Sequence, residues 1–250
     1  MNQHYYQAAR LRPFEDKSIH KVWVHPKDGS SAFPRPVSQL AAAQNFQTPE
    51  IERFQEKTEA KAGRAFQNPG ELCNRERDAI AEWIALHIIR SKKSHSEIFP
   101  SIEEYNRLFF EEFEKEVLIT RKFTSYPPIA ATGGRFFITS DEPIVEFRGA
   151  LEHKEIARGF AKSPEILIMF GLQPALPEFP LPVEDHFNAM VFANTGEFVY
   201  SHRKDVSLSN LKDIAKKYGM IPTRQSITFE GKLSSGDVEH LSAIRGRKAN

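Results

Sequence analysis

The hydrophobic pattern changes its period near the middle of the chain, and this change limits the possible folds more than any other feature. Apolar residues recur at helical spacing over residues 48–120. Short apolar segments bounded by turn residues follow over residues 130–230, and these indicate strands. Helices grouped before strands favour an α+β fold over a parallel βαβ sheet. We therefore predict a three-helix layer, about residues 48–120, packed on a mixed or antiparallel sheet formed by an amino-terminal strand and residues 135–230.

Three helices are predicted within that first region. Thr48-Pro49-Glu50 starts the first one, because a hydroxyl cap precedes Pro at the first helical position. The second covers about residues 71–91, and the third starts at the capping box Ser101-Ile102-Glu103-Glu104. A further helix is predicted over residues 208–218, and residues 187–193 are ambiguous, with a helix favoured. Strands are predicted over residues 21–25, 135–139, 144–147, 165–170 and 198–200, with one more at 227–229.

The totals are those of an ordinary globular protein. The chain has 250 residues, of which 40% are hydrophobic, and Lys plus Arg (34) nearly equals Asp plus Glu (33). Overall charge therefore does not predict strong steering towards nucleic acid. We expect a single domain over residues 1–250. Its parts are an extended segment (1–47), a helical part (48–120), a sheet-rich part (130–230) and a frayed basic tail (240–250).

The predicted cellular compartment follows from signals that the sequence lacks. The lone Cys73 cannot form an internal disulfide, and the start of the chain has no basic leader followed by an apolar run. No apolar stretch approaches the ~20 residues that cross a bilayer. We predict a cytoplasmic protein with no membrane partner, and the sequence leaves the oligomeric state open.

The segment Thr139-Ser140-Asp141-Glu142-Pro143 follows an apolar strand directly, and strand ends are common places for sites. Asp141 and Glu142 could bind a divalent metal or act as acid and base. The alternative is that Ser140 and Asp141 form a turn before Pro143 and bond local backbone. The sequence leaves both interpretations open.

Other polar groups are weaker candidates. Arg90 is followed five positions later by His95, which is the spacing of HEPN-type ribonucleases, although a cation at a helix carboxyl end also has a dipole explanation. At the amino terminus, His4 and Tyr5 belong to a run of hydrogen-bonding side chains, although chain ends are usually frayed. Asn188 and Asn194 are expected to be structural amides that bond loop backbone.

Several signatures of known enzymes are missing: the sequence has no GxGxxG, Walker loop, GxSxG or HExxH motif. A restriction-type nuclease would follow its Asp with Glu-x-Lys on the next strand. Here the corresponding segment is Glu165-Ile166-Leu167, with Leu in the place of Lys.

Residues 2–215 resemble, in order, the bacterial family described as domain of unknown function 4238, which has no assigned reaction. The resemblance rests on Gln3-His4-Tyr5, on Arg90 at the end of a central helix, and on Ile138 to Pro143, which is similar to the Ile-Thr-Ser-Asp-Asn-Pro signature of the family. Asn188 and Asn194 resemble its last block. The resemblance implies that His4 and Tyr5 are ordered near the Ser140–Asp141 loop.

We therefore predict one polar site assembled from His4, Tyr5, Arg90, Ser140 and Asp141. As an enzyme, the chain would be a phosphodiester hydrolase or nuclease, with His4 as acid or base and Arg90 stabilising phosphate charge. The metal, held by Asp141 and Glu142, is not identified by the sequence; Mg²⁺ or Mn²⁺ would suit such ligands. The substrate would be nucleic acid or a nucleotide. The alternative is a non-catalytic module that binds a protein partner and in which the same residues form a buried structural network.

Overall fold

The structure is a computed structural model that describes residues 10–40, 48–67, 74–90, 101–148, 156–171, 179–220 and 233–248. The chain divides into two compact units, and each unit combines two separate stretches of sequence. The sheet unit consists of Met1–Ala43 and Phe123–Arg224, and the helical unit consists of Gln44–Lys122 and Gln225–Asn250. The predicted α+β class is confirmed. The predicted single domain is thus subdivided into two units that are interleaved along the chain.

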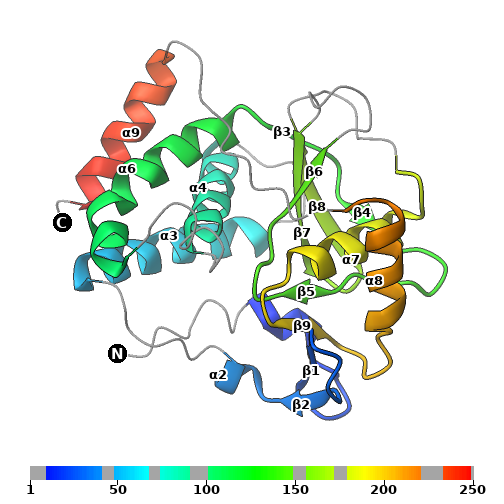
Figure 1. The fold of residues 1–250 in the computed structure, drawn as a ribbon. Coiled ribbons are helices and arrows are strands. Elements are labelled where there is room, and N and C mark those ends of the chain that lie inside the picture. The colour runs from blue at the N-terminus through cyan, green and yellow to red at the C-terminus, as the bar shows by residue number, and fades with distance from the viewer. Residues whose placement is uncertain are drawn as a thin grey trace. The chain divides into compact units, whose positions relative to one another are not determined.

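The sheet unit contains all the described strands and three of the described α-helices (Figure 1). Its elements in chain order are η1 (Arg12–Phe14), β1 (Val22–Pro26), β2 (Phe33–Arg35), α2 (Val37–Leu40), β3 (Thr124–Ser125), β4 (Ile129–Ala130), β5 (Thr139–Ser140), β6 (Val145–Arg148), β7 (Ile156–Ser163), β8 (Ile166–Gly171), α7 (Val183–Asn194), β9 (Phe198–Ser201) and α8 (Leu208–Lys217).

These strands form two sheets in which every described pair is antiparallel. One sheet has the order β2-β1-β9-β5, and the other has the order β3-β8-β7-β6 with β4 also paired to β8. The first sheet joins distant parts of the chain, since Trp23 of β1 lies opposite Ser201 of β9 and Thr139 of β5 lies opposite Tyr200. The sequence predicted one mixed or antiparallel sheet, whereas the structure contains two antiparallel sheets.

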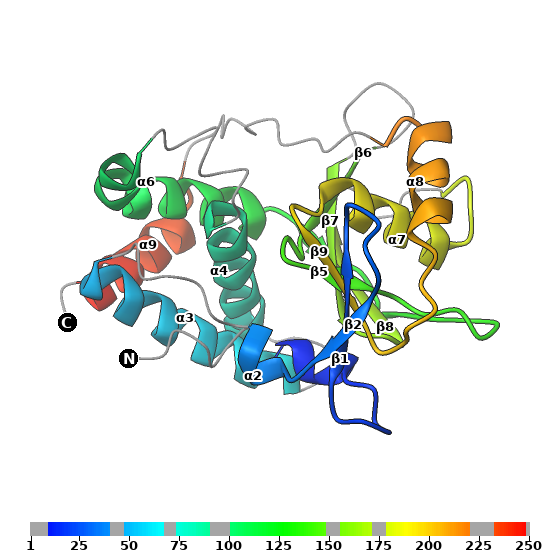
Figure 2. The ribbon, with the colours of Figure 1, turned by 60° about the horizontal axis from the view of Figure 1, so that its bottom comes forward.

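Helix α7 packs against strands of both sheets, β5 and β6, and lies beside α8 (Figure 2). One hydrophobic core unites these elements: Phe14, Val24, Ile138, Val145, Leu167, Met169, Phe187, Val191, Val199 and Leu211 are all buried in it. The predicted helices at 187–193 and 208–218 are confirmed as α7 and α8. The sheet unit is therefore a helix-covered pair of sheets with a core of its own.

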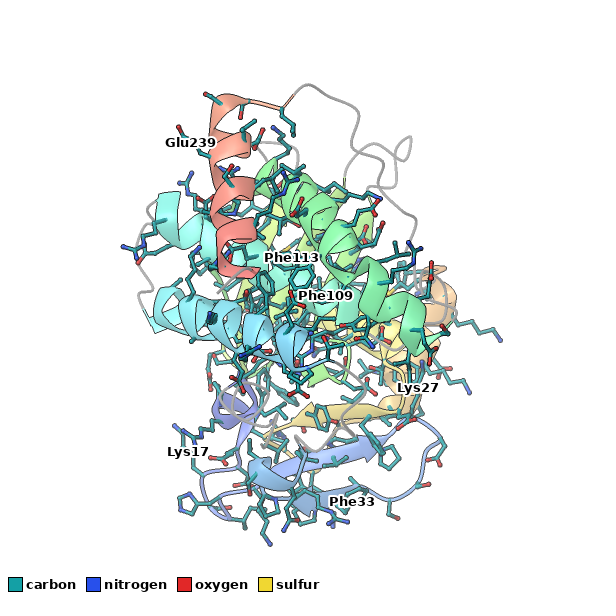
Figure 3. The ribbon with its side chains drawn as sticks, turned by 90° about the vertical axis from the view of Figure 1, so that its left-hand side faces the viewer. Lys17, Lys27, Phe33, Phe109, Phe113 and Glu239 are labelled. Atoms are coloured by element: carbon teal, nitrogen blue, oxygen red, sulfur yellow. The ribbon has the colours of Figure 1, made fainter. Side chains whose placement is uncertain are left out.

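The helical unit consists of α3 (Pro49–Gln67), α4 (Asn74–Arg90), α6 (Ile102–Arg121) and α9 (Ser235–Lys248) among the described residues. Its core is aromatic, and Phe109 and Phe113 of α6 lie at its centre with Phe54 of α3 in edge-to-face contact (Figure 3). The Ser101 half of the predicted capping box is confirmed by the bond from the Glu104 N–H to Ser101 Oγ, whereas the Glu104 carboxylate pairs with Arg107. Thr48 Oγ1 likewise accepts from the Ile51 N–H. All three helices predicted within residues 48–120 are present.

The prediction of a frayed basic tail over residues 240–250 is wrong, because α9 extends to Lys248. Leu241 and Ile244 of α9 are buried in the core of the helical unit. The basic side chains of α9 form ion pairs with other helices: Arg245 pairs with Glu114 at 2.7 Å, and Arg247 pairs with Glu82 at 2.8 Å. The charges that looked like a solvated end therefore help to dock the helix.

The predicted strand over residues 135–139 is also largely wrong, because only Thr139 of this range is in a strand. An amide side chain replaces the missing strand partner. Asn188 Oδ1 accepts from the Ile138 N–H at 2.9 Å, and Asn188 Nδ2 donates to the Phe136 carbonyl at 2.8 Å. The backbone of the segment is thus satisfied without a ladder.

Candidate functional site

Asp141, the centre of the predicted site, accepts three backbone hydrogen bonds. Its Oδ1 accepts from the Gly196 N–H at 3.1 Å, and its Oδ2 accepts from the N–H groups of Glu197 (2.7 Å) and Phe198 (3.3 Å). These amides form the turn that links α7 to β9. A carboxylate offers about four lone-pair positions, so one remains for any further ligand. The arrangement anchors a turn.

Gly196 lies close to the Asp141 carboxylate in this turn. A Cβ atom at this position would lie 3.2 Å from Asp141 Oδ2. A side chain here would require the carboxylate to shift by a few tenths of an ångström. The turn and Asp141 are therefore matched to each other in shape as well as in hydrogen bonding.

Ser140 and Glu142 lie inside the sheet unit on either side of Asp141. Ser140 is fully buried, and its Oγ accepts from the Glu142 N–H at 3.1 Å and donates to the Glu142 carbonyl at 2.8 Å. The Glu142 side chain is 3% exposed. A buried hydroxyl that hydrogen-bonds local backbone in this way stabilises a turn.

Arg10 connects the amino-terminal segment to this turn. Its Nη1 donates to Thr139 Oγ1 at 2.8 Å, and its Nη2 donates to the Ser140 carbonyl at 3.0 Å. The predicted site residues His4 and Tyr5 lie outside the described residues. The sequence analysis overlooked Arg10, although an arginine in a segment expected to pack near Ser140 is a signal that could have found it.

Burial also changes the pKa of Tyr200, a residue of β9 that lies opposite Thr139 of β5. Burial raises the pKa of the Tyr200 phenol, and the negative charge of Asp141 raises this pKa further. Tyr200 therefore stays neutral at ordinary pH and cannot supply a phenolate for catalysis.

Arg90, the remaining predicted site residue, belongs to the helical unit and not to the sheet unit. Its guanidinium pairs with the carboxylate of Glu59, which is 8% exposed. Arg90 thus bridges α4 and α3. The described contacts do not bring it together with Ser140 or Asp141, and His95 lies outside the described residues.

The helical unit contains a second polar cluster that the sequence analysis did not anticipate. Glu82 is fully buried and lies 2.8 Å from Lys61 Nζ, 2.8 Å from Arg247 Nη2 and 3.2 Å from His240 Nε2. Burial by itself would raise the pKa of Glu82, but His240, Arg247 and Lys61 outweigh it and lower that pKa to about 2. The cluster joins α3, α4 and α9 through charge.

A depression of about 380 Å³ lies on the sheet unit, beside the turn that Asp141 holds. It was also missed by the sequence analysis. Its lining comes from the residue after β1, the end of α7 and one face of α8: Lys27, Phe192, Ala193, Lys212, Ala215, Lys216, Gly219 and Met220. Lysines at spacing i, i+4 on an amphipathic helix that ends at a glycine were the available signal.

Within the described residues, no group of three or more His, Cys, Asp or Glu side chains is arranged to hold a metal ion. In the same part of the chain, no helix is both long and apolar enough to cross a membrane.

Comparison with protein-family profiles, with curated protein sequences and with solved structures finds no match to this chain. The resemblance to domain of unknown function 4238 therefore stays a prediction.

Proposed function

We propose that this chain is a non-catalytic binding module in which the Ser140–Asp141 turn is structural. The observation that carries this proposal is the set of three backbone N–H groups bound by the Asp141 carboxylate. Together with Arg10 and Asn188, this carboxylate fixes irregular backbone around β5 and β9. A hydrogen-bonded network of this kind supports a rigid scaffold, and rigid scaffolds are what binding surfaces require.

The alternative proposal is the phosphodiester hydrolase, acting on nucleic acid or a nucleotide. Asp141 and Glu142 would then hold Mg²⁺ or Mn²⁺, with His4 and Arg90 acting on the phosphodiester. Three features weaken its support: Glu142 is almost fully buried, Arg90 is paired with Glu59, and the Asp141 oxygens already accept three bonds. It remains the rival that the following experiment addresses.

Thermal melting of the wild type and of Asp141→Ala, with and without Mg²⁺ or Mn²⁺, separates the two proposals. We expect Asp141→Ala to lose about 1–3 kcal/mol of unfolding free energy, because it leaves backbone donors without their acceptor. We expect neither metal to change either melting temperature.

Asp28→Ala is the matched control, because Asp28 is an exposed carboxylate whose described bonds go only to Ser30. It should melt close to the wild type. If a metal instead raises the melting temperature of the wild type but not that of Asp141→Ala, then Asp141 is a ligand and the hydrolase proposal replaces the binding module.

A further inference from the structure

The depression on the sheet unit combines an apolar floor with a basic edge. The floor consists of Phe192, Ala215 and Met220. Phe192 and Ala215 are each 7% exposed, so they are core residues that only just reach the surface. Lys212 and Lys216 are exposed on the edge. The depression is open to solvent, and none of the described residues that line it is acidic.

The positions of Lys212 and Lys216 at the edge of the depression are set by helix α8. Lys212, Ala215 and Lys216 lie at positions i, i+3 and i+4, which share one face of α8, and Gly219 and Met220 follow the end of the helix. Asp213 is not among the residues that line the depression. The side chains of Lys212 and Lys216 form no hydrogen bond or ion pair with another described residue. Both ammonium groups are therefore available to an anion from outside.

Lys27 has a different role, because it builds the depression. Its Nζ donates to the Thr195 carbonyl at 2.5 Å and to the Ala193 carbonyl at 3.4 Å, at the carboxyl end of α7. Its backbone N–H donates to the Glu197 carbonyl at 2.9 Å. The lysine thus offsets the negative end of the α7 dipole, and with Asp141 it holds the turn that follows Ala193.

We propose that this depression docks an acidic peptide segment of a partner protein. An apolar side chain of the segment would lie on Phe192, Ala215 and Met220, and neighbouring carboxylates would pair with Lys212 and Lys216. This inference rests on the proposed binding function and names its surface and the chemistry of its partner.

Two features favour a peptide over a nucleotide or nucleic acid. The Phe192 ring is buried, with Lys27 Nζ 5.6 Å from its centroid, so it does not offer a face on which a base could stack. The depression is also open, whereas pockets for small ligands enclose most of the ligand surface. One or two side chains of a larger partner suit such a surface better.

Fluorescence anisotropy of the full chain at low ionic strength tests the proposal. The probe is a fluorescein-labelled peptide with two central leucines flanked by glutamates. Comparison probes carry glutamine for every glutamate, or serine for both leucines, and a labelled oligothymidine represents nucleic acid. We expect the acidic leucine peptide to bind best, since it alone supplies both the charge and the apolar side chains.

The deciding variant is Lys212→Glu combined with Lys216→Glu. It should weaken binding of the acidic peptide about tenfold or more, because attraction becomes repulsion at both sites. The matched control is Lys17→Glu combined with Lys57→Glu, which changes net charge equally at two exposed positions outside the depression. This control should bind within about twofold of the wild type, since neither lysine lines the depression.

Three results would overturn the proposal. The wild type might fail to prefer the acidic peptide to its glutamine version, or the Lys212/Lys216 variant might bind it as well as the control does. Tighter binding of oligothymidine through the same two lysines would assign the surface to nucleic acid instead. Each of these results leaves the Asp141→Ala melting experiment unaffected, so a wrong surface and a wrong functional class are told apart.

Discussion

The two units of this protein satisfy their buried polar side chains in different ways. In the sheet unit many of these side chains bind backbone, although the buried Arg158 lies 3.9 Å from Glu146. Asp141 accepts from three N–H groups, Asn188 bonds both ways with residues 136 and 138, and the Glu184 carboxylate accepts from the N–H and hydroxyl of Thr132. Burial disfavours the Glu184 charge, but backbone and Thr132 donors hold the pKa of Glu184 below its usual value.

In the helical unit the buried polar side chains more often bind one another. Glu82 faces Lys61, His240 and Arg247, while Asp237 pairs with Arg121 at 2.9 Å and also accepts from the Ser234 N–H. Away from the helix ends the backbone groups bond within the helix, so polar side chains between helices have mainly other side chains as partners. Short strands and irregular turns leave backbone N–H and C=O groups without backbone partners, and polar side chains hydrogen-bond to them. The contrast shows that the kind of polar contact in each unit follows from its secondary structure.

The largest expected effect tests the ion-paired side of this contrast. Glu82→Gln removes the buried charge that three basic side chains face, and we expect it to cost about 3 kcal/mol of unfolding free energy, measured by urea titration. The matched control is Glu114→Gln, whose partner Arg245 is 64% exposed. Because Arg245 lies largely in solvent while Glu114 is partly buried, we expect this pair to contribute about 1 kcal/mol or less. Equal losses in the two variants would contradict the special role of Glu82.

The pH dependence of this loss provides an internal check. Because the folded-state pKa of Glu82 is lowered from 4.5 to about 2, its stabilising contribution is complete above about pH 4.5 and is lost as pH falls towards 2. The difference between wild type and Glu82→Gln should therefore shrink over that interval. A difference that stays constant down to pH 2 would mean that the charge of Glu82 is not what stabilises the unit.

A smaller effect is expected from the backbone-directed side of the contrast. Asn188→Ala leaves the Ile138 N–H and the Phe136 carbonyl without their partner, and it should cost about 2 kcal/mol. Because the lost bonds are neutral, the cost should not depend on salt. Asn210→Ala, at an exposed position on α8, should cost far less. A strongly salt-dependent loss for Asn188→Ala would break the distinction between the two units.

The smallest expected effect is that of salt itself, and the sequence provides a reporter for each unit. Of the two tryptophans, Trp23 lies in β1 and Trp83 lies in α4. In Trp23→Phe, the remaining fluorescence reports the helical unit, and in Trp83→Phe it reports the sheet unit. Adding salt to 1 M should lower the stability reported by Trp83 by about 1 kcal/mol or less, and that reported by Trp23 by less still. Equal sensitivity would show that the ion pairs contribute no difference.

Local signals explain which elements the sequence predicts well. The helices at 48–120 are stabilised within their own segments by caps at Thr48 and Ser101 and by a regular apolar face, so they can be recognised without knowing their partners. In contrast, α9 depends on Glu82 and Glu114, which lie far away in the sequence. Strand β7 mixes apolar residues with Arg158, Gly159 and Lys162, and it is a strand because β6 and β8 pair with it on both sides.

The site shows the same division. The sequence draws attention to Ser140 and Asp141 because a polar turn after an apolar strand is conspicuous. It does not show their role, since the N–H groups that Asp141 binds lie 55–57 residues further along the chain. The lysine-edged depression escapes prediction for a related reason. Lys212 and Lys216 look like an ordinary solvated helix face until α7 and Lys27 are placed beside them.

The interleaving of the two units has a consequence for how the protein is made. The hydrogen bond between His25 and Ser201 spans 176 positions, and that between Arg247 and Glu82 spans 165. A ribosome adds residues at about 5–20 per second, so β1 and α4 leave the exit tunnel many seconds before β9 and α9 exist. Neither unit can finish folding on the nascent chain until most or all of the other has been synthesised. During that interval Glu82 has no Arg247 and β1 has an unpaired edge, so translation speed and chaperones should influence the yield of native protein more than they would for two domains encoded one after the other.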